Sequence, residues 1–129
     1  MKVIETDGIV LKTMDFKEKD SILTFLTREV GKRAGVFHGG KSLRSGNAAK
    51  AELFVLNHFE FSEKPSTELV RIRKCELLES YPPLRQNYSK FLNANYFSEL
   101  LLQCEIPSID SQDYFDLLKN TMSLLSETQ

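Results

Sequence analysis

The sequence contains no tryptophan, and only two of its 129 residues are cysteines. Cys75 and Cys104 form no CxxC pair, and neither histidine lies at metal-ligand spacing from them, which argues against a disulfide framework or a four-ligand zinc site. No apolar run approaches the roughly 18 residues that cross a membrane, and the N-terminus lacks the long apolar stretch of a signal peptide. We therefore expect a cytoplasmic protein with two free thiols and without a metal, a cofactor or a membrane anchor.

The hydrophobic content of 41% and the charged content of 27% are typical of a folded globular protein. The net charge of −1 conceals an uneven distribution. Residues 1–80 carry 14 basic and 12 acidic side chains, whereas residues 81–129 carry 3 and 6. Within residues 28–50, six basic residues stand against the single acid Glu29. Such a patch can bind a polyanion, although a solvated loop is the simpler alternative.

Residues 1–80 have the pattern of a small β-barrel. Gly31 supplies a hairpin turn after the second run, and Gly8 interrupts the first, where we expect a bulge or a bend. A glycine-rich loop with one helical turn, at 48–52, separates the third run from the fourth, as in an OB-fold; an SH3-like barrel is the second choice. The β-branched and aromatic runs, separated by turn residues, are 1–13, 20–27, 32–38, 53–61 and 68–76.

Residues 81–129 are predicted to be a small α-helical segment that begins after Pro82 and Pro83, so that the fold class is α+β. Pro107 separates two helices, the second of which Asp110 or Ser111 can cap. The apolar stripe of the first helix is Tyr88, Leu92, Tyr96 and Leu100, with Phe91 and Leu101 beside them. The stripe of the second helix is Tyr114, Leu117, Leu118, Met122 and Leu125. Both stripes need cover from the barrel, from each other or from further sequence.

Evidence for an enzyme is weak. Residues 35–42 match the phosphate-binding pattern G-x-x-x-x-G-K-[ST], but no long helix and no βαβ unit follow, so we interpret the match as chance. No serine lies in a G-x-S-x-G elbow, and only His38 and His58 are candidate bases. We expect no catalytic residues.

Nucleic-acid binding has better support, because an OB-fold binds single strands with cations and flat side chains. The candidates for phosphate contacts are Lys32, Arg33, Lys41, Arg44 and Lys50, extended by Arg71 and Arg73. Phe37 and His38 are candidates for stacking on bases. The structural alternatives are core packing for Phe37 and a solvated strand face for the two arginines of residues 68–76. A competing function is an OB-like protein-interaction module whose helical part binds an amphipathic partner segment.

Three segments resemble the N-terminal domain of the RecO family of bacterial DNA repair and recombination mediators. They are GIVLK at 8–12, DFKEKDSILTFLTREVGK at 15–32 and ELLESYP at 76–82. The resemblance implies an OB-fold followed by a helical domain, binding of single- and double-stranded DNA, and annealing of complementary strands. It also implies partners, namely RecR and single-strand binding protein, in the loading of RecA. RecO proteins are about twice this long, and many carry a four-cysteine zinc site that has no counterpart in this sequence.

Overall fold

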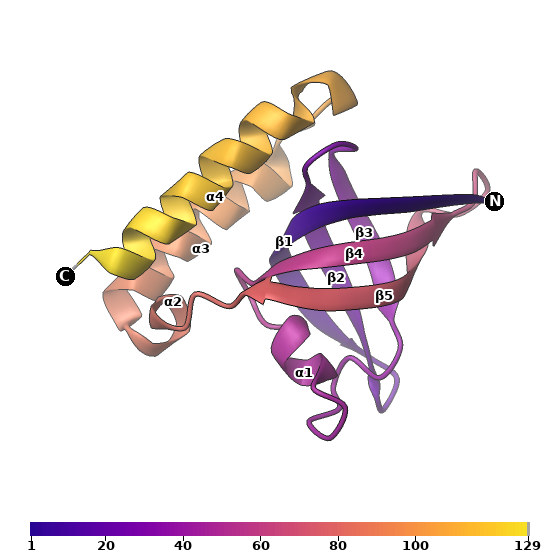
Figure 1. Cartoon of the computed structure of the whole chain (residues 1–129), viewed down its shortest axis with the longest axis horizontal. Coiled ribbons are helices and arrows are strands. Elements are labelled where there is room, and N and C mark those ends of the chain that lie inside the picture. The colour runs from indigo at the N-terminus through magenta and orange to yellow at the C-terminus, as the bar shows by residue number, and fades with distance from the viewer. Residues whose placement is uncertain (129) are drawn as a thin grey trace.

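The computed structural model describes residues 1–128 and has five strands followed by a helical segment (Figure 1). The strands are β1 (Lys2–Phe16), β2 (Asp20–Thr27), β3 (Lys32–Phe37), β4 (Leu56–Glu63) and β5 (Leu69–Glu79). The helices are α1 (Asn47–Lys50), α2 (Pro83–Gln86), α3 (Tyr88–Gln103) and α4 (Ser111–Glu127), with a short 3₁₀ turn at Ser108–Asp110. The predicted α+β class and its five strands are confirmed.

The strands close into a barrel in the order β1-β2-β3-β5-β4. All neighbours are antiparallel except β3 and β5, which pair in parallel. The long connection between β3 and β4, which contains α1, leaves a place in the barrel between these two strands, and β5 occupies it. No helix within the described residues is long and apolar enough to span a membrane.

Alternation along the strands builds the barrel interior. Phe25 and Phe59 are fully buried and stack with ring centroids 4.1 Å apart. Gly8 lies beside both rings, and a Cβ there would come within 3.0 Å of Phe59. Of the two features expected at Gly8, a bulge or a bend, the bulge is not found there: the register shift of β1 lies between Val10 and Lys12, and Gly8 is paired on both sides. Gly8 instead makes room for two aromatic rings.

The helical segment packs on one end of the barrel and forms a second core with it. Ile9, Leu11 and Leu26 of the barrel meet Phe115, Leu118 and Met122 of α4 there. Polar contacts fix the position of α4: the Ser111 hydroxyl accepts the Gly31 N–H at 2.8 Å and donates to the Thr27 carbonyl at 2.7 Å. Gly31 has φ +72° in the predicted hairpin turn, and its N–H faces the start of α4 rather than solvent.

The predicted stripe of α3 does not face the core. Tyr88, Leu92, Tyr96 and Leu100 are exposed, whereas Ala94 and Ser98 on the opposite side are buried. α3 lies close to the barrel and α4, so small side chains occupy its contact, flanked by Phe91, Leu101 and Leu102. For α4 the prediction was right for Leu118 and Met122 but wrong for Tyr114 and Leu117, which are exposed. The side chain that takes their place in the core is Phe115.

Candidate nucleic-acid interface

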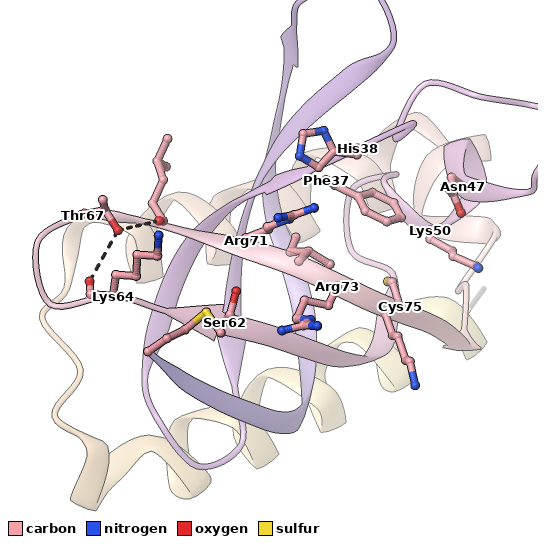
Figure 2. A pocket seen from close by; sticks show the side chains of 14 residues that line it. Phe37, His38, Asn47, Lys50, Ser62, Lys64, Thr67, Arg71, Arg73 and Cys75 are labelled. Atoms are coloured by element: carbon pink, nitrogen blue, oxygen red, sulfur yellow. Dashed lines mark hydrogen bonds between the residues drawn. The ribbon is translucent and has the colours of Figure 1, made fainter.

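A groove of about 850 Å³ runs along the outer face of β5 (Figure 2). Its walls come from the end of β3, from α1, from β5 and from the turn between β4 and β5. Figure 2 shows Lys64 at the turn, Arg71 and Arg73 over the middle of β5, and Lys50 at the end of α1. We call the five cations of this lining, Lys50, Lys64, Arg71, Arg73 and Lys74, together with the space between them, the basic groove.

A bulge in β5 explains why so many cations share one face. Val70 and Ile72 point into the barrel, so Arg71 and Arg73 point outward as alternation predicts. The register then shifts, because Phe61 pairs with Ile72 and Glu60 with Lys74, which leaves Arg73 as the extra residue. The phase of the strand changes there, and Lys74 is exposed beside Arg73 instead of pointing inward.

Little within residues 1–128 neutralises these cations. No Asp or Glu side chain of the described residues lines the groove. Arg73 meets Glu60 only at 4.0 Å, and among the described residues Lys50, Lys64, Arg71 and Lys74 have no carboxylate within ion-pair distance. Close positive charges without counter-charges raise the local potential and attract a polyanion.

His38 lies at the edge of the groove and is held by Asp20 of β2. The His38 Nδ1 atom is 3.2 Å from one carboxylate oxygen of Asp20, and the other accepts the Gly39 N–H at 2.9 Å. The hydrogen bond from Gly39 holds the pKa of Asp20 below its ordinary value, and His38 lowers it further. This carboxylate is therefore a fixed negative partner that orients the imidazole at the end of β3.

The floor of the groove is apolar and closed. Phe37 is only 6% exposed and belongs to the barrel core, together with Ile72. The Cys75 thiol also lines the floor, and burial raises its pKa to about 12, so it is a neutral thiol. A base cannot stack on Phe37 in this conformation, because the ring is covered by its neighbours.

Two of the predicted site residues, Lys32 and Arg33, bind other groups of the protein instead of facing the groove. The Lys32 ammonium donates to the carbonyls of Leu101, at 2.7 Å, and Leu102, at 3.0 Å, and it also contacts that of Cys104 at the end of α3. Burial lowers the pKa of Lys32, and the nearby charge of Glu105 acts in the opposite direction. Arg33 pairs with Glu63 at 2.5 Å.

The other predicted residues separate into two places. Lys41 and Arg44 do not line the groove: Lys41 pairs with Asp15 at 3.5 Å, and Arg44 is exposed near the loop tip. Phe37, His38, Lys50, Arg71 and Arg73 line the groove. The structure thus brings together five of the nine predicted residues, and binding by all nine stays a prediction.

Lys64 and Lys74 line the groove and were not predicted. The alternation of residues 68–76 assigns Lys74 to the inner face, and only the bulge moves it outward. Lys64 belongs to the turn Glu63-Lys64-Pro65-Ser66, and its only sequence signal is its charge.

The match to a phosphate-binding loop has no structural counterpart in the described residues. Gly35 lies within β3, and a Cβ there would come within 2.7 Å of Val70. The N–H groups of Lys41 and Ser42 donate to the carbonyls of Lys19 and Gly39, so they do not point at a ligand. The helix that follows, α1, has four residues.

Comparison with known protein families gives one consistent result. The sequence model for the family "Recombination protein O N terminal" matches residues 1–81. Proteins named DNA repair protein RecO from Syntrophus aciditrophicus, Acaryochloris marina and Trichodesmium erythraeum are 28%, 33% and 32% identical to the chain. These matches cover 95%, 96% and 99% of this chain, but 48%, 42% and 44% of the relatives. The chain therefore spans a little under half the length of these relatives.

Proposed function

Because this chain belongs to the RecO N-terminal family, we propose that it acts in DNA repair and recombination as a non-enzymatic, cytoplasmic DNA-binding module. Residues 1–80 would be an OB-fold barrel that binds single- and double-stranded DNA, and residues 81–129 a helical segment. The strand order β1-β2-β3-β5-β4, with its parallel β3–β5 pair, supports the OB-fold over the SH3-like alternative.

The observation that carries this proposal is the basic groove. From Leu69 to Cys75, β5 extends over about 20 Å, at roughly 3.3 Å per residue. A nucleic-acid strand laid along β5 would therefore pass its phosphates beside the five cations.

The chemistry of the groove favours contacts to phosphates over contacts to bases. Its cations are long and flexible, its one aromatic ring besides His38 is the buried Phe37, and phosphate contacts carry no sequence information. Neutralised strands repel each other less, so complementary bases can meet. We infer annealing of single strands on this basis, and loading of RecA with RecR and single-strand binding protein from the resemblance to RecO.

A salt series with a labelled single-stranded oligonucleotide tests the groove. Five phosphate contacts predict a log–log slope of about −3.5, which is about a hundredfold loss of affinity between 50 and 200 mM salt. Arg71→Ala with Arg73→Ala should reduce the slope by about 1.4. The control is Lys12→Ala with Lys119→Ala, which removes two positive charges outside the groove lining. Equal slopes for the two variants would reject the assignment.

A second candidate function is protein binding by the helical segment. It is favoured by the exposed side chains of Leu92, Tyr96 and Leu100 on α3. Partner binding of this kind would be insensitive to salt and would survive Arg71→Ala with Arg73→Ala. The same pair of variants therefore separates the two candidate functions.

A further inference from the structure

The floor of the basic groove gives nucleobases little to stack on. Phe37, Ile72 and the Cys75 thiol form part of this floor, and the first two side chains are only 6% and 4% exposed. Successive bases of a single strand stack on open aromatic faces, and the Phe37 ring is covered. Among residues 1–128, the floor therefore offers no platform for a row of bases.

The uncharged hydrogen-bonding side chains of the lining are also few. Ser62 is only 8% exposed. The Thr67 hydroxyl lies 3.4 and 3.3 Å from the carbonyls of Lys64 and Leu69, shown by the dashed lines in Figure 2, and is already used in the turn. Asn47 is the remaining amide or hydroxyl side chain of the lining. Recognition of a base needs donors and acceptors along its edge, so the groove is poorly equipped to bind bases.

Positive charge, in contrast, reaches the groove from three elements. Arg71 and Arg73 extend from β5, Lys64 from the β4–β5 turn and Lys50 from the end of α1 (Figure 2). Burial raises the pKa of the Cys75 thiol to about 12, and the charge of Lys50 acts in the opposite direction, so this charge is felt at the floor. A phosphate inside the groove would thus be neutralised from more than one side.

These differences separate the two sides of a bound strand. Inside the groove, phosphates gain cationic partners, whereas bases gain neither a stacking surface nor a set of hydrogen-bonding partners. On the basis of the proposed function, we propose that a single strand lies in the basic groove with its sugar–phosphate backbone against β5 and its bases turned to solvent. The base-pairing edges of the bound strand stay open, so a complementary strand can pair with it before it leaves the protein.

His38 is the exposed ring of the lining, and its position agrees with this orientation. Its side chain is 57% exposed, and its Nδ1 atom is held 3.2 Å from Asp20 at the edge of the groove. A base that is turned outward at this end can stack on the imidazole. One ring at one end leaves the other bases of the strand unbound.

A strand without bases tests the orientation. A labelled abasic oligonucleotide keeps the sugar–phosphate chain, and its affinity should be within about threefold of that of oligothymidylate of the same length, because phosphates supply the contacts. Bases held in the groove would instead make the abasic strand bind about a hundredfold more weakly, since stacking contributes at every base. Arg71→Ala with Arg73→Ala should weaken both strands by the same factor. The control, Lys12→Ala with Lys119→Ala, should weaken both of them less.

An uncharged complement tests whether the bound strand is open for pairing. A peptide nucleic acid carries no phosphates, so the cations of the groove do not attract it. We saturate a labelled DNA strand with protein at low salt, where dissociation is slow, and expect it to pair with this complement as fast as the free strand does. Bases held in the groove would limit pairing to the rate of strand dissociation, which is measured with an unlabelled competitor.

The outcomes separate the orientation of the strand from DNA binding itself. Similar affinities for the two strands, together with pairing as fast as that of the free strand, support the proposal. If oligothymidylate binds but the abasic strand is strongly weakened, or if pairing waits for dissociation, the orientation is overturned and the proposed DNA binding stands. A chain that binds neither strand overturns the proposed function and the orientation with it.

Discussion

The barrel carries two groups of basic side chains that have opposite roles. At the β2–β3 turn, Arg28 stacks on the Phe115 ring at 4.6 Å and pairs with Asp116 of α4 at 3.3 Å, while Lys32 contacts the end of α3. Along β5, Arg71 and Lys74 have no carboxylate within ion-pair distance among the described residues. The first group is consumed in attaching the helices to the barrel. The side chains of the second group are free to bind a ligand. A positive charge therefore does not by itself identify a binding residue; the absence of an ion-pair partner within the fold does.

The largest expected effect concerns Lys32. Lys32→Met keeps an apolar stem but removes the ammonium that satisfies carbonyls at the end of α3. We expect the free energy of unfolding, measured by urea denaturation, to fall by about 2 kcal/mol. The salt slope of DNA binding by the folded variant should stay as in the parent chain. Lys12→Met is the control for a change of an exposed lysine on β1. A lower salt slope with an unchanged free energy of unfolding would show that Lys32 contacts DNA and does not stabilise the attachment of α3.

The next effect compares the groove with the loop. Lys64→Ala with Lys74→Ala should lower the salt slope of single-strand binding by about 1.4, because both side chains line the basic groove. Lys41→Ala with Arg44→Ala should lower it by less, since Lys41 already has Asp15 as a partner. Both effects should be the same for all base sequences. If the loop pair has the larger effect, the DNA path crosses the loop after β3 instead of following β5.

The smallest expected effect is a pH dependence of the free energy of unfolding that arises from His58 on β4. His58 Nδ1 lies 2.8 Å from Asp7, which raises the pKa of His58 above its ordinary value. The stability from this pair is therefore fully present below the unfolded pKa of about 6.5, and it is lost as the pH rises through the higher folded pKa. Urea denaturation at pH 5.5 to 8.5 should show this decrease. His58→Gln should remove this component, and an unchanged pH profile in that variant would refute its origin.

Sequence reasoning located the strands better than it located the site. The bounds of β2 were predicted without error, because alternation over residues 20–27 is regular and Gly31 marks the turn. The inward positions of Val70 and Ile72 followed from the same alternation. The bulge at Arg73 could not be predicted, since it depends on pairing with β4, a strand from another part of the sequence. Lys74 was missed for that reason.

In the helical segment, too, the sequence predicted the secondary structure but not the tertiary contacts. The four-residue spacing of Tyr88, Leu92, Tyr96 and Leu100 identified a helix correctly, but the side it buries was wrong. The spacing of apolar residues shows that one side of a helix is apolar, but it does not show whether that side packs against the core. Ala94 and Ser98 became the inner side because the helix approaches the barrel and α4 closely, and their small size is a weak signal in a sequence.

The sequence by itself determined the α+β class, the five strands, the family and the local excess of positive charge, because these depend on composition, alternation and turn residues that act over a few positions. Only the tertiary structure decided which cations stay free. Lys32 and Arg71 have the same charge and both lie on strands, yet α3 ends beside one and nothing within residues 1–128 covers the other. Contacts between segments far apart in the chain decide whether a basic side chain is used inside the fold or stays free. These contacts cannot be predicted from the pattern of neighbouring residues.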